Sequence, residues 1–205
     1  MTRSNVGLGL LVVTSSLVLW GCTPGGVGDP CIPEDEYSTE FSGYSAEEVN
    51  VESRSFQCET RVCLVNHFQG RVSCPYGQTQ EAVARDPADG AAEDRCHIPG
   101  TLGDRVEDAV QVPVNPQLVD RQALDTVYCS CRCANAEGKT DDGANYCEKC
   151  PSGYSCTQLI DNLGLGNQQL AGAYCIRNGT KYSKNTLDPT PCDPALGNCG
   201  EAQPY

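Results

Sequence analysis

Aromatic and large aliphatic side chains are scarce in this sequence. Its 205 residues include three phenylalanines and a single tryptophan, Trp20, which lies near the N-terminus. A chain of this length is long enough to bury a sizeable core, but this composition supplies little apolar surface to fill one. Another source of stability must therefore replace part of the missing hydrophobic burial.

Positive charge is also scarce. The sequence has 14 Lys and Arg against 27 Asp and Glu, which gives a formal net charge of −13 at pH 7. A nucleic-acid-binding surface needs clustered Lys and Arg, and so does electrostatic adhesion to anionic lipid. We therefore expect no nucleic-acid partner. A cationic or calcium-bridged partner remains compatible with this charge.

Residues that commonly carry catalysis are few. The chain has only two histidines, His67 in a predicted turn and His97 directly after a cysteine. It has no Gly-x-Ser-x-Gly, no His-Glu-x-x-His and no phosphate-binding glycine loop. Its acidic residues are numerous, but nothing singles out a hydrolytic pair. We expect no enzymatic activity and no cofactor.

The longest apolar run is too short to cross a membrane. It extends from Val6 to Leu19, whereas a membrane-spanning helix needs about 20 residues, so the run has the length of a signal-peptide core. It ends in Leu19-Trp20-Gly21-Cys22. These four residues resemble the lipobox of bacterial lipoproteins, with Trp20 at a place where a small residue is usual.

The resemblance implies that residues 1–21 are a signal peptide and that Cys22 receives a diacylglyceryl thioether and an N-acyl chain such as palmitate. Two or three chains anchor a protein stably, since each buried methylene contributes about 0.8 kcal/mol. Because Thr23 rather than Asp follows the cysteine, the resemblance also implies the bacterial outer membrane. The alternatives are a secreted protein in which Cys22 is incidental and an uncleaved membrane helix.

Cysteine, in contrast, is abundant, with fifteen in the chain. Without Cys22 an even number remains, which fits seven disulfides in an exported protein, each contributing about 2–4 kcal/mol. We expect a small disulfide-rich fold, mostly coil, with short antiparallel β-hairpins and at most one or two short helices. The disulfide candidates are Cys31, Cys58, Cys63, Cys74, Cys96, Cys129, Cys131, Cys133, Cys147, Cys150, Cys156, Cys175, Cys192 and Cys199.

The positions of these cysteines bear on domain organisation. Five lie at or before Cys96 and nine at or after Cys129; because both counts are odd, complete oxidation requires at least one bridge between the two groups. Cys192 and Cys199 are expected to pair with each other. The expected boundaries are a flexible tether over 22–30, one stapled region over 31–187 with subregions 31–96 and 97–187, and a Pro-rich tail over 188–205.

Local patterns predict a few short elements. Ser45-Ala-Glu-Glu48 fits a capping box at the start of a short helix, and residues 78–95 are predicted to form an exposed loop. Two hairpins are expected. One joins strands at 61–65 and 71–75, and the other spans residues 174–182 around a type I′ turn at Asn-Gly.

The densest cysteine cluster runs from Cys129 to Cys156 and holds six of the fifteen. Its first three cysteines, at alternate positions, are predicted to project from one face of a single strand, each toward a different partner. Cys150-Pro-Ser-Gly-Tyr-Ser-Cys156 resembles the closing segment of EGF-like modules, although the Cys-x-Cys-x-Cys start departs from their cysteine order. The cluster is therefore expected to be an architectural hub.

Chemical roles for this cluster are alternatives to that structural one. Cys147-x-x-Cys150 could supply thiolates to a zinc site or form an exported thiol–disulfide redox pair. A loop of oxygen ligands could instead make a calcium- or glycan-binding surface module. The residues of that loop and its neighbouring tyrosines are Asp141, Asp142, Asn145, Tyr146 and Tyr154. The leading expectation is a non-enzymatic, lipid-anchored envelope protein with a structural or binding role and a protein or glycan partner.

Overall fold

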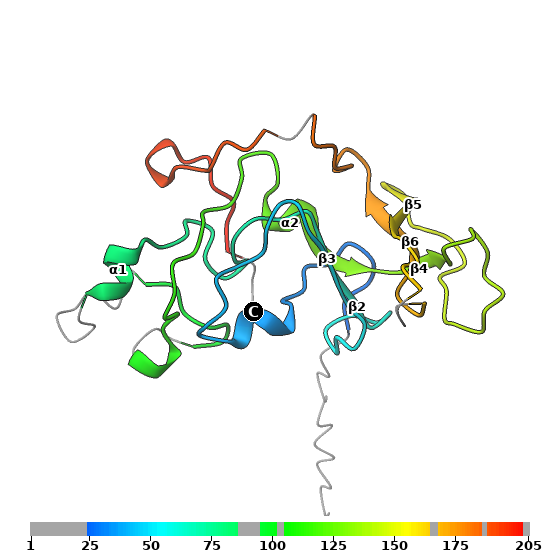
Figure 1. Ribbon diagram of the computed structural model, residues 1–205, viewed down its shortest axis with the longest axis horizontal. Coiled ribbons are helices and arrows are strands. Elements are labelled where there is room, and N and C mark those ends of the chain that lie inside the picture. The colour runs from blue at the N-terminus through cyan, green and yellow to red at the C-terminus, as the bar shows by residue number, and fades with distance from the viewer. Residues whose placement is uncertain (1–23, 86–94, 102–104, 165–167, 186–187, 203–205) are drawn as a thin grey trace, which may run out of the picture.

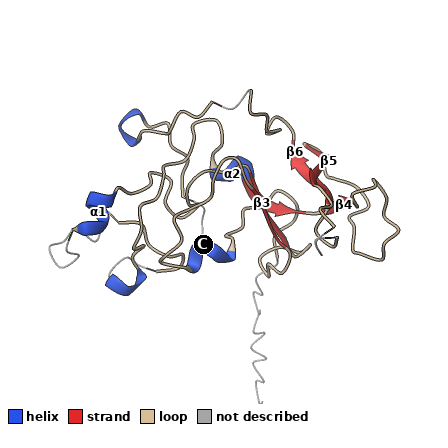
Figure 2. Cartoon of the chain, viewed as in Figure 1, coloured by secondary structure: helices blue, strands red, loops and turns tan. Residues whose placement is uncertain are grey.

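The computed structural model describes residues 24–85, 95–101, 105–164, 168–185 and 188–202. Over these ranges short strands gather on one side of the molecule, and coil with short helical turns makes up the other (Figures 1 and 2). This confirms the expected small, disulfide-rich, mostly coil fold. The helices are α1 (Gln80–Ala84) and α2 (Ala123–Thr126), and the strands are β1 (Val49–Glu52), β2 (Val62–Asn66), β3 (Val127–Ser130), β4 (Arg132–Ala134), β5 (Tyr154–Ile160) and β6 (Gly172–Arg177).

The first sheet has the order β1-β2-β3, with both pairs antiparallel. Strand β2 reads Val-Cys-Leu-Val-Asn without polar alternation, because both faces of the strand are covered. Cys63 and Val65 face one buried cluster, and Leu64 faces another. A strand buried on both faces is expected to be apolar at successive positions.

The second sheet has the order β4-β6-β5, also antiparallel. The chain passes from the first sheet to the second at Cys131, whose carbonyl accepts a hydrogen bond from the Cys175 amide at 2.9 Å. The prediction of one continuous strand over residues 129–133 is therefore wrong. Up to Ser130 the backbone pairs with β2, and from Arg132 it pairs with β6.

The two sheets share a small apolar core. Leu64 and Tyr128 of the first sheet meet Tyr174 and Ile176 of the second, and all four side chains are buried. The Tyr128 hydroxyl accepts a hydrogen bond from the Arg177 amide at 2.9 Å, so its one polar atom is satisfied inside this core.

All fourteen cysteines from Cys31 onward lie in disulfides. Cys58–Cys129 is the bridge between the two cysteine groups, and Cys192 and Cys199 pair with each other as predicted. The three cysteines at 129, 131 and 133 bond three different partners. The remaining bridges are Cys31–Cys63, Cys74–Cys96, Cys131–Cys147, Cys133–Cys156 and Cys150–Cys175.

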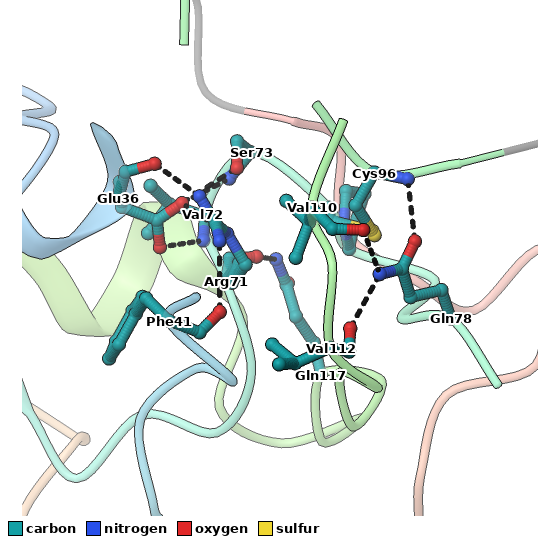
Figure 3. The surroundings of a disulfide bond; sticks show 12 residues. Glu36, Phe41, Arg71, Val72, Ser73, Gln78, Cys96, Val110, Val112 and Gln117 are labelled. Carbon is teal, nitrogen blue, oxygen red and sulfur yellow. Dashed lines mark hydrogen bonds and ion pairs between the residues drawn. A yellow bond between two sulfur atoms is a disulfide. The ribbon is translucent and has the colours of Figure 1, made fainter. Parts of the chain in front are cut away.

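The irregular part of the described chain, residues 34–48, 68–85, 95–101 and 105–119, is organised by buried polar side chains. Arg71 and Glu36 are both fully buried and form an ion pair at 3.3 Å. Arg71 also donates to the carbonyls of Ser38 and Phe41 at 3.0 and 2.9 Å, while Glu36 accepts from the Val72 amide at 2.8 Å (Figure 3). Burial raises the pKa of Glu36, against the opposing charge of Arg71.

Gln78 likewise satisfies backbone groups further along this segment. Its amide group donates to the carbonyls of Val110 and Val112 at 3.1 and 2.6 Å and accepts from the Cys96 amide at 3.0 Å (Figure 3). One side chain thus satisfies three backbone groups that belong to no strand.

Three local predictions in this part of the chain are wrong. Residues 45–48 form a turn rather than a helix, with the Ser45 carbonyl accepting from the Glu48 amide. Residues 71–75 form no strand, because Arg71 and Cys74 close a turn and β2 pairs with β1 and β3 instead. The predicted loop over 78–95 contains α1, whose N-terminus is capped by the Thr79 hydroxyl; residues 86–94 lie outside the described ranges.

The predicted hairpin over residues 174–182 is also corrected. Strand β6 ends at Arg177, and its partners are β5 and β4 rather than the residues after the turn. The Thr180 amide donates to the Arg177 carbonyl, and the positive φ of 90° is found at Gly179 but not at Asn178. This is the pattern of a type II turn, which redirects the chain, rather than of type I′.

Candidate functional site

The lipidation candidate Cys22 lies outside the described residues, but the segment that follows it is part of the folded body. The Gly25 amide donates to the Gln57 carbonyl at 2.7 Å, and the Glu59 amide donates to the Gly25 carbonyl at 2.9 Å. Gly25 thus lies in a parallel bridge beside Cys58. We call these residues, 24–30 with the 56–61 turn, the anchor junction.

The anchor junction continues along β3. The Gly28 amide donates to the Cys129 carbonyl and the Cys129 amide to the Asp29 carbonyl, both at 2.8 Å. Gly28 has a φ of 101°, and a Cβ there would collide with the Tyr154 ring. Glycine is therefore required both for the backbone conformation and for the space beside Tyr154. Over residues 24–30 the expected flexible tether is therefore replaced by an ordered segment, because β3 offers its free edge to the chain.

Phe56 and Arg61 are exposed side chains of the 56–61 turn that lie against each other. Phe56 is 81% exposed, and the Arg61 guanidinium lies 4.6 Å from the centre of its ring. Arg61 has a φ of 63°, a left-handed conformation that few residues other than glycine adopt. The Arg61 amide donates to the Cys58 carbonyl at 3.0 Å, which closes the turn directly over the Cys58–Cys129 bridge.

The hub cysteines are paired in a way that does not match the alternative redox pair or zinc site. Cys147 bonds Cys131 and Cys150 bonds Cys175, so the Cys-x-x-Cys residues have different partners. Two groups of three sulfurs lie within 4.8 Å, but each group draws its atoms from two adjacent disulfides. Zinc binds thiolates, and these sulfurs are bonded to each other instead.

One calcium candidate, Asp142, lies in a polar network with a cation that the chain itself supplies. Arg132 lies 3.5 Å from the Asp142 carboxylate, and that carboxylate also accepts hydrogen bonds from the Tyr146 hydroxyl at 2.7 Å and the Ala144 amide at 3.0 Å. The hydrogen bond from Tyr146 lowers the pKa of Asp142. Partial burial and the same hydrogen bond raise the pKa of Tyr146 to about 12.

The other members of this candidate site do not converge on Asp142. Asp141 accepts from the Asn135 side chain at 3.4 Å, and Asn145 is exposed. Tyr146 lies against Arg132, whereas Tyr154 packs on Tyr128 at 5.6 Å. The geometry gives no support to a shared calcium or glycan site, since the nearest charge to Asp142 is already positive.

The two histidines lie in different places. His97 lines a cavity of about 450 Å³ with Arg95, whose guanidinium is held by the carbonyls of Ala82 and Val83, and no carboxylate is among the described residues that line it. His67 stacks on Tyr182 at 3.8 Å, and burial lowers the pKa of its imidazole. The His67 Nδ1 atom also lies 3.1 Å from the Ala46 carbonyl oxygen, so this imidazole takes part in local packing and hydrogen bonding.

Comparisons with protein-family models, with curated protein sequences and with solved structures found no match. Among the described helices, none has the length and apolar character needed to cross a bilayer. The site must therefore be interpreted from its own geometry.

Sequence reasoning missed the anchor junction and the role of Arg132. Phe56 was visible as one of three phenylalanines, in the polar stretch Arg-Ser-Phe-Gln, but this gave no usable signal, because Phe68 in the similar stretch Asn-His-Phe-Gln is buried. The pairing of Gly25 with the same turn had no local signal, because a Gly-rich segment after a lipobox is also the composition of a flexible linker.

Proposed function

We propose that the mature chain is a lipid-anchored, cysteine-rich protein of the bacterial cell envelope, with a binding or structural role rather than a catalytic one. The observation that carries the proposal is the sequence Leu19-Trp20-Gly21-Cys22 after an apolar run that is bounded by Arg3. Acylation at Cys22 supplies the membrane affinity that the acidic body lacks. The outer membrane is the compartment that Thr23 favours.

The body beyond the anchor supports this proposal. Seven disulfides suit an oxidising envelope compartment. The anchor junction places the first described residues directly on the stapled core, so an anchored body would be held close to the membrane. Exposed loops such as 136–149 remain available to a protein partner.

The proposal is tested by expressing the full chain in a bacterium that processes lipoproteins. Intact-mass analysis should show cleavage before Cys22 and the added mass of a diacylglyceryl and an N-acyl group. The protein should float with outer-membrane vesicles, whereas Cys22→Ser should lose both the added mass and the cleavage. A mature N-terminus at another residue, or a cleaved wild-type chain without acyl mass, would contradict lipidation.

A further inference from the structure

The anchor junction fixes which face of the body meets the membrane. This inference rests on lipidation at Cys22. Gly25 follows Cys22 by three positions, and three residues of extended chain span at most about 11 Å. Because Gly25 is hydrogen-bonded to Gln57 and Glu59, the 56–61 turn directly contacts a residue that lies within that reach of the acylated residue.

The side chains of this turn suit a membrane interface. Phe56 is the most exposed large hydrophobic residue of the described chain, at 81%. Arg54 and Arg61 are both exposed beside it, in a protein with a net charge of −13. An aromatic ring flanked by cationic groups fits the boundary between acyl chains and phosphate headgroups, where guanidinium groups bind phosphate oxygens.

The turn holds Phe56 in place rather than letting it fold back. The Ser55 amide donates to the Arg61 carbonyl at 3.1 Å, and Cys58 beneath the turn is fully buried in its bridge to Cys129. Arg61 occupies a left-handed conformation that glycine adopts without strain. Strained positions of this kind persist where the side chain has a task, and here that side chain covers the Phe56 ring.

We propose that Phe56, with Arg54 and Arg61, forms a second membrane contact that inserts into the phospholipid surface beside the acyl anchor and orients the body on it. The ring enters the interfacial region and the two guanidinium groups bind headgroup phosphates. Glu59, also exposed on this turn, reduces the net positive charge of the contact. Membrane binding therefore depends on the Phe56 ring as well as on the arginines.

The chain offers a clean optical test. Cleavage before Cys22 removes Trp20, the only tryptophan, so Phe56→Trp places a single fluorophore at the proposed contact. The lipidated full chain is reconstituted in vesicles of phosphatidylethanolamine and phosphatidylglycerol, with and without brominated acyl chains. We expect emission at shorter wavelength than in the urea-unfolded protein and strong quenching by the brominated lipid.

The matched control is Leu196→Trp, at a residue that is 73% exposed. It belongs to the 3₁₀ turn Pro194–Leu196 (red in Figure 1), which lies well apart from the 56–61 turn (cyan). In vesicle-bound protein this tryptophan should stay water-accessible and unquenched. Adding Arg61→Gly to Phe56→Trp keeps the turn and should reduce quenching; unchanged quenching would remove Arg61 from the proposal.

The outcomes separate this proposal from lipidation itself. If both variants carry acyl mass and float with vesicles, but Phe56→Trp is no more quenched than Leu196→Trp, the membrane contact is overturned and the anchor stays intact. Protein that neither carries acyl mass nor floats overturns the anchor, and the contact with it. A blue shift that grows with protein concentration in detergent, without lipid quenching, assigns Phe56 to a second copy of the chain and also overturns the contact.

Discussion

The strand half of the molecule, β1–β6, and the coil half, described residues 34–48, 68–85, 95–101 and 105–119, differ in where their backbone groups find partners. In the strand half, antiparallel ladders pair the backbone and five disulfides fasten the ladders together. In the coil half, side chains such as Arg71 and Gln78 donate to carbonyls that no strand reaches. A chain short of apolar residues thus replaces the missing hydrophobic burial in two ways. Disulfides stabilise the strand half, and buried polar side chains stabilise the coil half.

The difference predicts that the coil half is most sensitive to loss of a single polar side chain. Arg71→Met should remove the partner of buried Glu36 and leave the carbonyls of Ser38 and Phe41 unpaired. Breaking a buried ion pair costs about 3–5 kcal/mol, and the freed carbonyls place this change toward the upper end of that range. Urea unfolding of the oxidised protein measures the change in the free energy of unfolding.

The control is Arg105→Met, which breaks an ion pair with Glu107 whose two side chains are both 64% exposed. Surface pairs contribute about 0–1 kcal/mol, so this variant should unfold close to wild type. Equal effects of the two substitutions would mean that the Arg71 network does not hold the coil half.

The strand half should depend most on its longest covalent loop. Replacing both Cys58 and Cys129 by Ala opens a bridge between residues 71 apart, and the loop-entropy relation gives a loss of about 4 kcal/mol. The matched variant removes Cys192 and Cys199, which are 7 apart, and should cost about 2 kcal/mol.

Differential scanning calorimetry of the two double variants, each with its other six bridges verified by mass spectrometry, compares these effects. Equal destabilisation by removal of the short Cys192–Cys199 loop and by removal of Cys58–Cys129 would contradict this prediction. The bridge that joins the two cysteine groups would then not contribute the larger share of stability. Near-equal values would then have to be explained by packing of Cys192 against Pro75.

The smallest expected effect is a loss of stability at acidic pH that is due to His67. This residue lies where β2 ends and the coil half begins. Burial lowers the pKa of this imidazole, and Arg121 adds to the shift. The folded state therefore binds a proton less readily than the unfolded state, and the stability that neutral His67 contributes is full above the unfolded pKa of about 6.5. It is lost progressively as the pH falls below that value.

Thermal midpoints measured between pH 7.5 and 5 test this dependence. His67→Asn keeps a residue that tolerates the φ of 54° and should flatten the fall below pH 6.5. A wild-type slope that survives in His67→Asn would assign the acid sensitivity to other groups.

The sequence was most informative about the cysteines and about one apolar run, whereas local signals such as the Ser45–Glu48 capping box were misleading. The parity of the cysteines required a crossing bridge, and the short separation of Cys192 and Cys199 predicted their pairing. The apolar run Val62–Val65 marked β2 because a strand covered on both faces needs no polar positions. These predictions require little knowledge of which distant segments of the chain pair with each other.

Prediction failed where a distant partner decided the structure. The Asn178-Gly179 turn follows β6, but the strand that pairs with β6 comes before it, at Tyr154–Ile160. Arg71 and Glu36 would ordinarily be placed on the surface, and only their mutual burial reveals that they organise the coil half. Lipidation at Cys22 stays a prediction of the sequence, as do the envelope location and the absence of catalysis.

The bridge from Cys31 to Cys63 has a mechanical consequence. Tension applied at Cys22 reaches a covalent cross-link nine residues later, after crossing hydrogen bonds such as those of Gly25, Gly28 and Asp29. Force then enters the middle of the first sheet through β2, where Cys63 lies opposite Cys129, so the load is shared by two strands. Under tension, the hydrogen bonds of the anchor junction should therefore break first, while the disulfide-linked body resists extension.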